Sequence, residues 1–211
     1  MKKISISIFL SYCFVFQVFA FNNNLNNQNQ SWFFHKYLSI SCSIISSTTK
    51  FDKYQIKELS RKTKINLCID NNRFDKYELK EFLRSNITVG INQKNTIFDK
   101  YELRELAIAG AKIFIIAHQS NFDKYDLKEL IKSGIKIVIK THLSYFDKYA
   151  LKELLNAGAK IIIIAHKNTF DKYDLKELLL AGAIVKISGS QTNFDKYDII
   201  ELITAGAKLI P

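Results

Sequence analysis

Residues 146–169 read FDKYALKELLNAGAKIIIIAHKNT, and this 24-residue unit decides the fold. Its Phe-Asp-Lys-Tyr opening occurs at seven positions along the chain: Phe51, Phe74, Phe98, Phe122, Phe146, Phe170 and Phe194. The spacing between openings is 23 residues once and 24 residues five times. A fixed period of this length is typical of repeat proteins, in which each unit buries its apolar face against its neighbours.

Each unit begins with the signals of a helix start. In the sixth copy, Asp171 is an N-cap residue that precedes an apolar stripe containing Leu175 and Leu178. The helix is expected to end at Gly182, because glycine readily adopts the left-handed conformation that closes a helix. The second copy has Asn86 at this position, and asparagine is the next most permissive residue. The pattern predicts one amphipathic helix of about ten residues in each copy.

A β-branched run follows the glycine and has the length of one strand, as in residues 160–165. One strand and one helix per unit predict parallel strands side by side, with right-handed helical crossovers on one face. The fold class is therefore α/β, an open right-handed solenoid of seven strand-loop-helix repeats of about 24 residues, with a parallel sheet on one face and helices on the other. This layout resembles that of leucine-rich-repeat proteins over residues 51–211, although their Leu-x-x-Leu-x-Leu-x-x-Asn pattern is missing.

Alternation along the strands predicts which side chains face the open side of the sheet. Ile161, Ile163 and Ala165 are expected to point inward. An open sheet face with an apolar centre and polar ends is typical of a partner site. The sequence therefore predicts docking of a protein ligand, or self-association, through six residues: Phe114, Ile116, Val138, Lys140, Ile162 and Ile164. The opposing interpretation, that a cap segment or a simple preference for isoleucine explains the apolar patch, stays open.

A second candidate surface lies at the start of each helix, where a lysine and a tyrosine are present in all seven copies. As an alternative function, rows of these side chains would bind an anionic polymer or surface, such as a glycan, lipopolysaccharide or nucleic acid. The central members are Lys100, Tyr101, Lys124, Tyr125, Lys148, Tyr149, Lys172 and Tyr173. The opposing interpretation, that each tyrosine packs against the loop of the neighbouring repeat, stays open and is favoured.

The N-terminus predicts export. Residues 1–20 have the charged start, the apolar stretch and the small final residue of a signal peptide, with cleavage expected after Ala20. An Asn/Gln-rich linker (21–30), an N-terminal cap (31–50) and the seven-repeat solenoid (51–211) follow. The chain is thus expected to be secreted or periplasmic, in a bacterium to judge from its Ile/Lys/Asn-rich composition, without a membrane span. Its net charge of +11 falls to about +9 without Lys2 and Lys3, which favours anionic partners.

Cys42 and Cys68 are the two cysteines that remain after cleavage. They would pair in an oxidising compartment if they were close, but the strand alternation puts them on opposite faces. Two separate thiols are the favoured expectation, with pairing left open.

No catalytic motif and no cofactor-binding motif stands out in the chain, and the sequence accordingly predicts that it is not an enzyme. His118, His142 and His166 recur at one position of three successive copies and are weak candidates for a metal site. A secreted effector or toxin built on the same scaffold is a third alternative.

Overall fold

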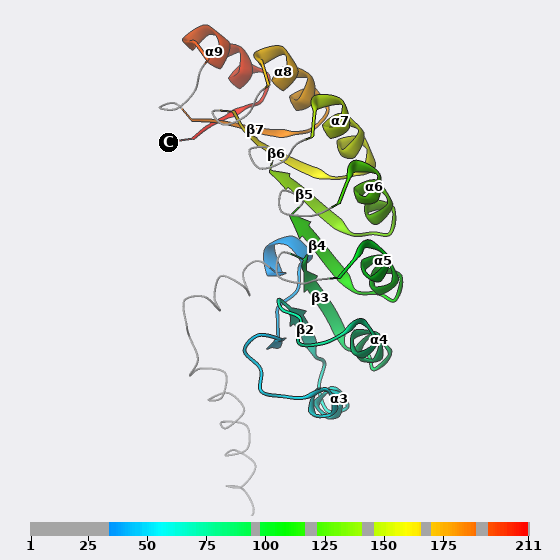
Figure 1. Ribbon diagram of the computed structural model, residues 1–211. Helices are drawn as coiled ribbons and strands as arrows, with labels where there is room; N and C mark the ends of the chain where they lie inside the picture. The colour runs from blue at the N-terminus through cyan, green and yellow to red at the C-terminus, as the bar shows by residue number, and fades with distance from the viewer. Residues whose placement is uncertain are drawn as a thin grey trace, which may run out of the picture.

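The computed structural model describes residues 34–93, 98–116, 122–140, 146–165, 170–188 and 194–210. Within them, eight parallel strands form one sheet in the order β1 to β8, which is also their order along the chain. Helices alternate with the strands and lie along the outer side of a curved sheet (Figure 1). No described strand joins β1 to β8, so the sheet is open, as the sequence predicts.

The strands are short and regular. Their bounds are β1 Ile44–Ile45, β2 Asn66–Ile69, β3 Thr88–Asn92, β4 Lys112–Ile116, β5 Lys136–Lys140, β6 Lys160–Ile164, β7 Ile184–Ser188 and β8 Lys208–Ile210. The helices between them are α3 Lys53–Ser60, α4 Lys76–Arg84, α5 Lys100–Ile108, α6 Lys124–Lys132, α7 Lys148–Ala157, α8 Lys172–Leu180 and α9 Lys196–Thr204.

The helix ends follow the local sequence signals. In α8 the side chain of Asp171 accepts a hydrogen bond from the backbone N–H of Asp174, which confirms its role as the N-cap. Gly158 has a φ of 108° and Asn86 a φ of 60°, so both take the left-handed conformation expected at the helix end. The predicted α/β solenoid is therefore confirmed at the level of its units.

The main core lies between the sheet and the helices. Ile161, Ile163 and Ala165 of the β6 region are buried there with Leu151 and Leu154 of α7. The same arrangement recurs from unit to unit, and this confirms the predicted phase of the strands. The other face of the sheet carries a second cluster, which is formed with the N-terminal segment.

Successive strands are shifted relative to one another. Ile91 of β3 pairs with Ile113 of β4, a separation of 22 residues, although the repeat is 24 residues long. Ile139 pairs with Ile161 in the same way. Equivalent residues are therefore two positions out of line on adjacent strands, and straight columns of identical strand residues do not form. Because two is an even number, the shift keeps every side chain on its predicted face.

Candidate functional site

The open face of the sheet is partly covered by residues 34–42, which we call the N-terminal strap. Phe34, Leu38 and Ile40 of the strap are buried against the sheet in one cluster with Phe114 and Val138. In Figure 1 this segment is the blue helix and trace on the side of the sheet opposite to α4 and α5. The sequence placed residues 31–50 in an N-terminal cap, and the burial of Phe114 and Val138 under this segment agrees with the opposing interpretation that a cap covers the apolar patch.

Specific contacts hold the strap in place. The rings of Tyr37 and Phe114 lie 4.2 Å apart, centroid to centroid, and Lys136 Nζ donates a hydrogen bond of 3.3 Å to the carbonyl oxygen of Tyr37. A Cβ at Gly90 would lie 2.7 Å from Ile40 Cδ1, so the strap approaches β3 more closely than a side chain there permits. A glycine within a strand is a known signal of such an approach, and it could have revealed the strap from sequence.

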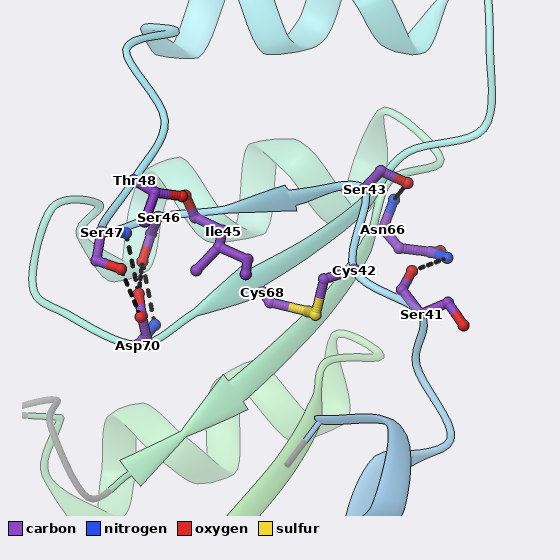
Figure 2. The surroundings of a disulfide bond; sticks show 10 residues. All are labelled: Ser41, Cys42, Ser43, Ile45, Ser46, Ser47, Thr48, Asn66, Cys68 and Asp70. Carbon is purple, nitrogen blue, oxygen red and sulfur yellow. Dashed lines mark hydrogen bonds between the residues drawn. A yellow bond between two sulfur atoms is a disulfide. The ribbon is translucent and has the colours of Figure 1, made fainter. Parts of the chain in front are cut away.

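A disulfide joins Cys42 to Cys68, and the expectation of two separate thiols is wrong (Figure 2). The predicted alternation failed because β1 begins only at Ile44, so Cys42 precedes the strand and its face is not fixed by strand parity. Cys68 lies on the open face of β2, where the strap passes. The bond closes a sequence separation of 26 residues, and a link of this size stabilises a fold by about 3–4 kcal/mol.

A polar cluster fixes the chain that follows the strap. Ser46 Oγ donates to Asp70 Oδ1 over 2.8 Å, and Ser47 Oγ donates to Asp70 Oδ2 over 2.6 Å (Figure 2). The backbone N–H of Ser47 donates to the same carboxylate. These bonds satisfy the buried carboxylate of Asp70 and tie the turn after β1 to the end of β2.

The strap divides the predicted docking residues into two groups. Phe114 and Val138 are only 1% and 3% exposed, which removes both from any contact surface. Ile116 and Ile162 pack against the edge of the same cluster and remain partly exposed. Lys140 and Ile164 are also partly exposed. The accessible part of the face therefore runs along β4–β8 beside the strap.

This part of the open face is basic. Its lysines are Lys112, Lys136, Lys140, Lys160, Lys186 and Lys208, and together with Ile116, Ile162 and Ile164 they make up what we call the basic sheet face. Strands β4 to β8 contain no aspartate or glutamate. The shift between strands puts Lys140 of β5 beside the apolar Ile162 of β6. It also puts Lys186 of β7 beside Lys208 of β8.

The lysine and tyrosine rows at the helix starts fit neither of the two predictions, which were an anion-binding surface and tyrosines packed on neighbouring loops. The seven tyrosines are 63–71% exposed, so the favoured expectation that they pack on neighbouring loops is wrong. The lysines beside them in the first six repeats are partly buried and pair with acids of the next repeat. Lys124 Nζ lies 2.8 Å from Glu153 Oε1, and Lys148 Nζ lies 2.6 Å from Asp174 Oδ1. Lys100 pairs with Asp126 in the same way.

These ion pairs shift the pKa values of several of their members. Hydrogen bonds from Lys124 and Lys128 lower the pKa of Glu153 below its ordinary value of 4.5. The hydrogen bond to Asp174 raises the pKa of Lys148 above 10.5. The row lysines therefore have their charges balanced within the protein, and anion binding by these rows loses its main physical basis.

Among the residues that the structure describes, no three or more histidine, cysteine, aspartate or glutamate side chains gather where they could hold a metal ion. The candidates His118, His142 and His166 all lie outside the described residues, as does the predicted signal peptide. None of the helices in the described ranges has the length and apolar character needed to cross a membrane.

No protein-family model and no curated protein matches the chain. Solved structures that align with it include the deoxyribose phosphate aldolase from Aeropyrum pernix, at 14% identity and a TM-score of 0.33, covering 80% of this chain and 83% of that chain. A dihydropteroate synthase from Thermus thermophilus aligns at 13% identity and a TM-score of 0.33, covering 80% and 86%. The N-acetyl-D-glucosamine-6-phosphate deacetylase from Mycobacterium smegmatis aligns at 12% identity and a TM-score of 0.34, covering 78% and 53%.

These neighbours correct one expectation. The sequence predicts that the chain is not an enzyme, but the solved structures that align with it are those of enzymes, so this expectation is not kept. TM-scores of 0.33–0.34 assign neither an activity nor a substrate to this chain.

Proposed function

We propose that the chain is an exported repeat scaffold that docks an acidic, partly apolar segment of a protein partner on the basic sheet face. One observation carries this proposal. The lysines of this face have no acidic residue beside them on β4–β8, whereas the lysines of the helix starts pair with carboxylates of the next repeat. A surface with unbalanced positive charge attracts anionic partners.

The geometry of the face supports a ligand that is apolar as well as anionic. Lys186 and Lys208 occupy partner positions on β7 and β8, and like charges side by side on a sheet repel each other. Ile162 and Ile164 lie on the adjoining strand β6 and are partly exposed. A segment with acidic and aliphatic side chains would relieve the repulsion and cover the isoleucines, which a purely ionic polymer would not do.

The Cys42–Cys68 disulfide supports the proposed export. Structural disulfides persist in oxidising compartments and are rare where thiols are kept reduced. The bond links the strap to the second strand, and an exported protein would keep it without reduction.

Fluorescence anisotropy with a labelled Glu/Leu-rich peptide tests the docking. We expect the peptide to bind the wild-type chain, and the Lys140→Glu/Lys186→Glu variant to bind on the order of tenfold more weakly, because repulsion replaces attraction. Raising the salt concentration should weaken wild-type binding, since exposed charges are screened. A Lys/Leu-rich peptide of the same length should not bind.

The matched control is Lys64→Glu/Lys132→Glu, which changes net charge by the same amount at two exposed lysines that lie outside the basic sheet face. It should retain binding to within about twofold, since distant charges are screened. Equal losses in both double variants would show that net charge alone attracts the peptide, and the proposed docking face would then be wrong.

A further inference from the structure

Every repeat carries an exposed tyrosine at the start of its helix, on the outer side of the solenoid. Packing in the core does not explain why this residue recurs, because the rings are not buried. The tyrosine column consists of Tyr54, Tyr77, Tyr101, Tyr125, Tyr149, Tyr173 and Tyr197. Each ring is 63–71% exposed, although the phenylalanine that opens the same repeat packs against the core in the described copies from Phe74 onward. The other exposed apolar side chains of the helices, such as Ile108 and Leu180, do not recur in every repeat.

A contact with lysine accounts for only part of this pattern. The Nζ of the preceding lysine lies 5.2 Å from the ring centroid of Tyr125 and 5.3 Å from that of Tyr149. The same lysines also pair with acids of the next repeat. The exposed fractions are measured with these lysines in place, so most of each ring remains open to a ligand.

The charges around the tyrosine column are balanced. Glu153 accepts hydrogen bonds from both Lys124 and Lys128, and Glu177 accepts one from Lys152 and lies 3.5 Å from Lys148. Carboxylates therefore stand in the same rows as the lysines. A polyanion such as a nucleic acid would meet repulsion from these carboxylates, and a polycation would meet the lysines. Electroneutral surroundings with exposed rings fit an uncharged ligand.

The regularity of the tyrosine column points to a ligand that is itself a polymer. Each repeat presents the same ring from the same position of its helix, and neighbouring packed helices lie about 8–10 Å apart. This spacing is comparable to the length of a disaccharide. Pyranose rings have C–H faces that stack on aromatic rings, and their hydroxyl groups can both donate and accept hydrogen bonds, as the adjacent lysines and carboxylates require.

We propose that the tyrosine column binds an uncharged polysaccharide, with every second sugar unit stacked on a tyrosine ring. This surface is separate from the basic sheet face, since it lies on the helices at the other side of the sheet (Figure 1). The two binding events are therefore expected to be independent.

Affinity electrophoresis of the full chain in gels that contain a β-glucan, an α-glucan, a mannan or heparin tests the proposal. We expect at least one uncharged polysaccharide to retard the wild-type chain, and the retardation to persist at about 1 M salt, where charge attraction is screened within about 3 Å. The variant Tyr125→Ala/Tyr149→Ala/Tyr173→Ala should lose about tenfold or more in affinity, because it interrupts a multivalent contact. The corresponding triple Phe variant keeps the rings and should retain binding.

The matched control is Ile108→Ala/Leu180→Ala, which removes two exposed apolar side chains from helices of the same row. This variant should bind like wild type. If the triple Ala variant does not fold, as judged by circular dichroism, the single Tyr149→Ala variant should weaken binding by about threefold through the same loss of avidity.

Three outcomes would overturn the proposal. They are no retardation by any uncharged polysaccharide, retardation that the alanine variants leave unchanged, and retardation by heparin alone that disappears with salt. The Lys140→Glu/Lys186→Glu variant should keep polysaccharide binding, so failure of the sheet-face proposal and failure of this one can be told apart.

Discussion

The ring of Tyr37 lies on that of Phe114, with 4.2 Å between their centroids, and this contact puts a segment from the start of the described chain on the middle of the sheet. Phe114 is 1% exposed as a result. Without the strap, Phe114 would be exposed to water on the open face of the sheet. The strap of the same chain covers it. The strap thus completes the fold and also limits where a partner can bind.

Replacing Phe114 by alanine should destabilise the protein by about 3–5 kcal/mol, the usual cost of removing a buried phenylalanine side chain. Urea unfolding followed by circular dichroism measures this free energy. The control Ile108→Ala removes an apolar side chain that is 73% exposed, and it should change stability by no more than about 0.5 kcal/mol. Similar costs for both variants would contradict the packing of the strap on β4.

Reduction of the Cys42–Cys68 disulfide should lower the free energy of unfolding by about 2–5 kcal/mol, because the unfolded chain regains the freedom of the closed loop. Thermal unfolding with and without dithiothreitol measures the change. The Cys42→Ala/Cys68→Ala variant serves as the control, since it should unfold at the lower temperature in both conditions. A wild-type melting temperature that does not respond to reductant would show that the bond does not stabilise the protein.

Gly90→Ala should cost about 1–3 kcal/mol, because the new methyl group would lie 2.7 Å from Ile40 Cδ1 and the buried Ile40 side chain would have to shift. Ile40→Val removes the Cδ1 atom, so the added cost of Gly90→Ala should be smaller in that background. A double-mutant cycle by urea unfolding measures this coupling. Additive effects would show that the two residues do not touch in solution.

Most of the repeat could be predicted because its signals are local. Asp171 caps a helix whose first turn follows directly, and Asn86 ends one in the left-handed conformation. Successive side chains of a strand point to opposite faces, so Ile161 and Ile163 are buried while Ile162 and Ile164 lie on the open face. Each of these features depends on residues within a few positions of one another, so propensity and periodicity are sufficient to find them.

The candidate site could be predicted only in part, because it depends on contacts that the repeat does not encode. The period of 24 residues does not determine that Ile91 pairs with Ile113, since strand tilt and twist set the shift between neighbours. The contact of Ile40 with Gly90 joins a non-repeating segment to a repeat. The pairing of each lysine with the next repeat depends on the distance between helices, which the sequence pattern leaves open.

The ion pairs between repeats should make the stability of the protein sensitive to acid. A hydrogen bond from Lys152, followed by the nearby charge of Lys148, lowers the pKa of Glu177 in the folded state below 4.5. A carboxyl group with a lowered pKa contributes stability above its unfolded value, and this contribution is lost as the pH falls through the folded value. Glu153 and Glu201 are shifted in the same direction, so stability should fall steadily as the pH drops below about 4.5.

Urea unfolding at intervals between about pH 6 and about pH 3 measures this dependence. In the variant Lys152→Met, the pKa of Glu177 should return toward 4.5, because its first hydrogen-bond donor is gone. The loss of stability on acidification should then be shallower than in wild type. Lys132→Met is the matched control, since Lys132 is exposed and no described carboxylate pairs with it. It should leave the slope unchanged, and equal slopes in all three proteins would show that the inter-repeat pairs do not couple folding to protonation.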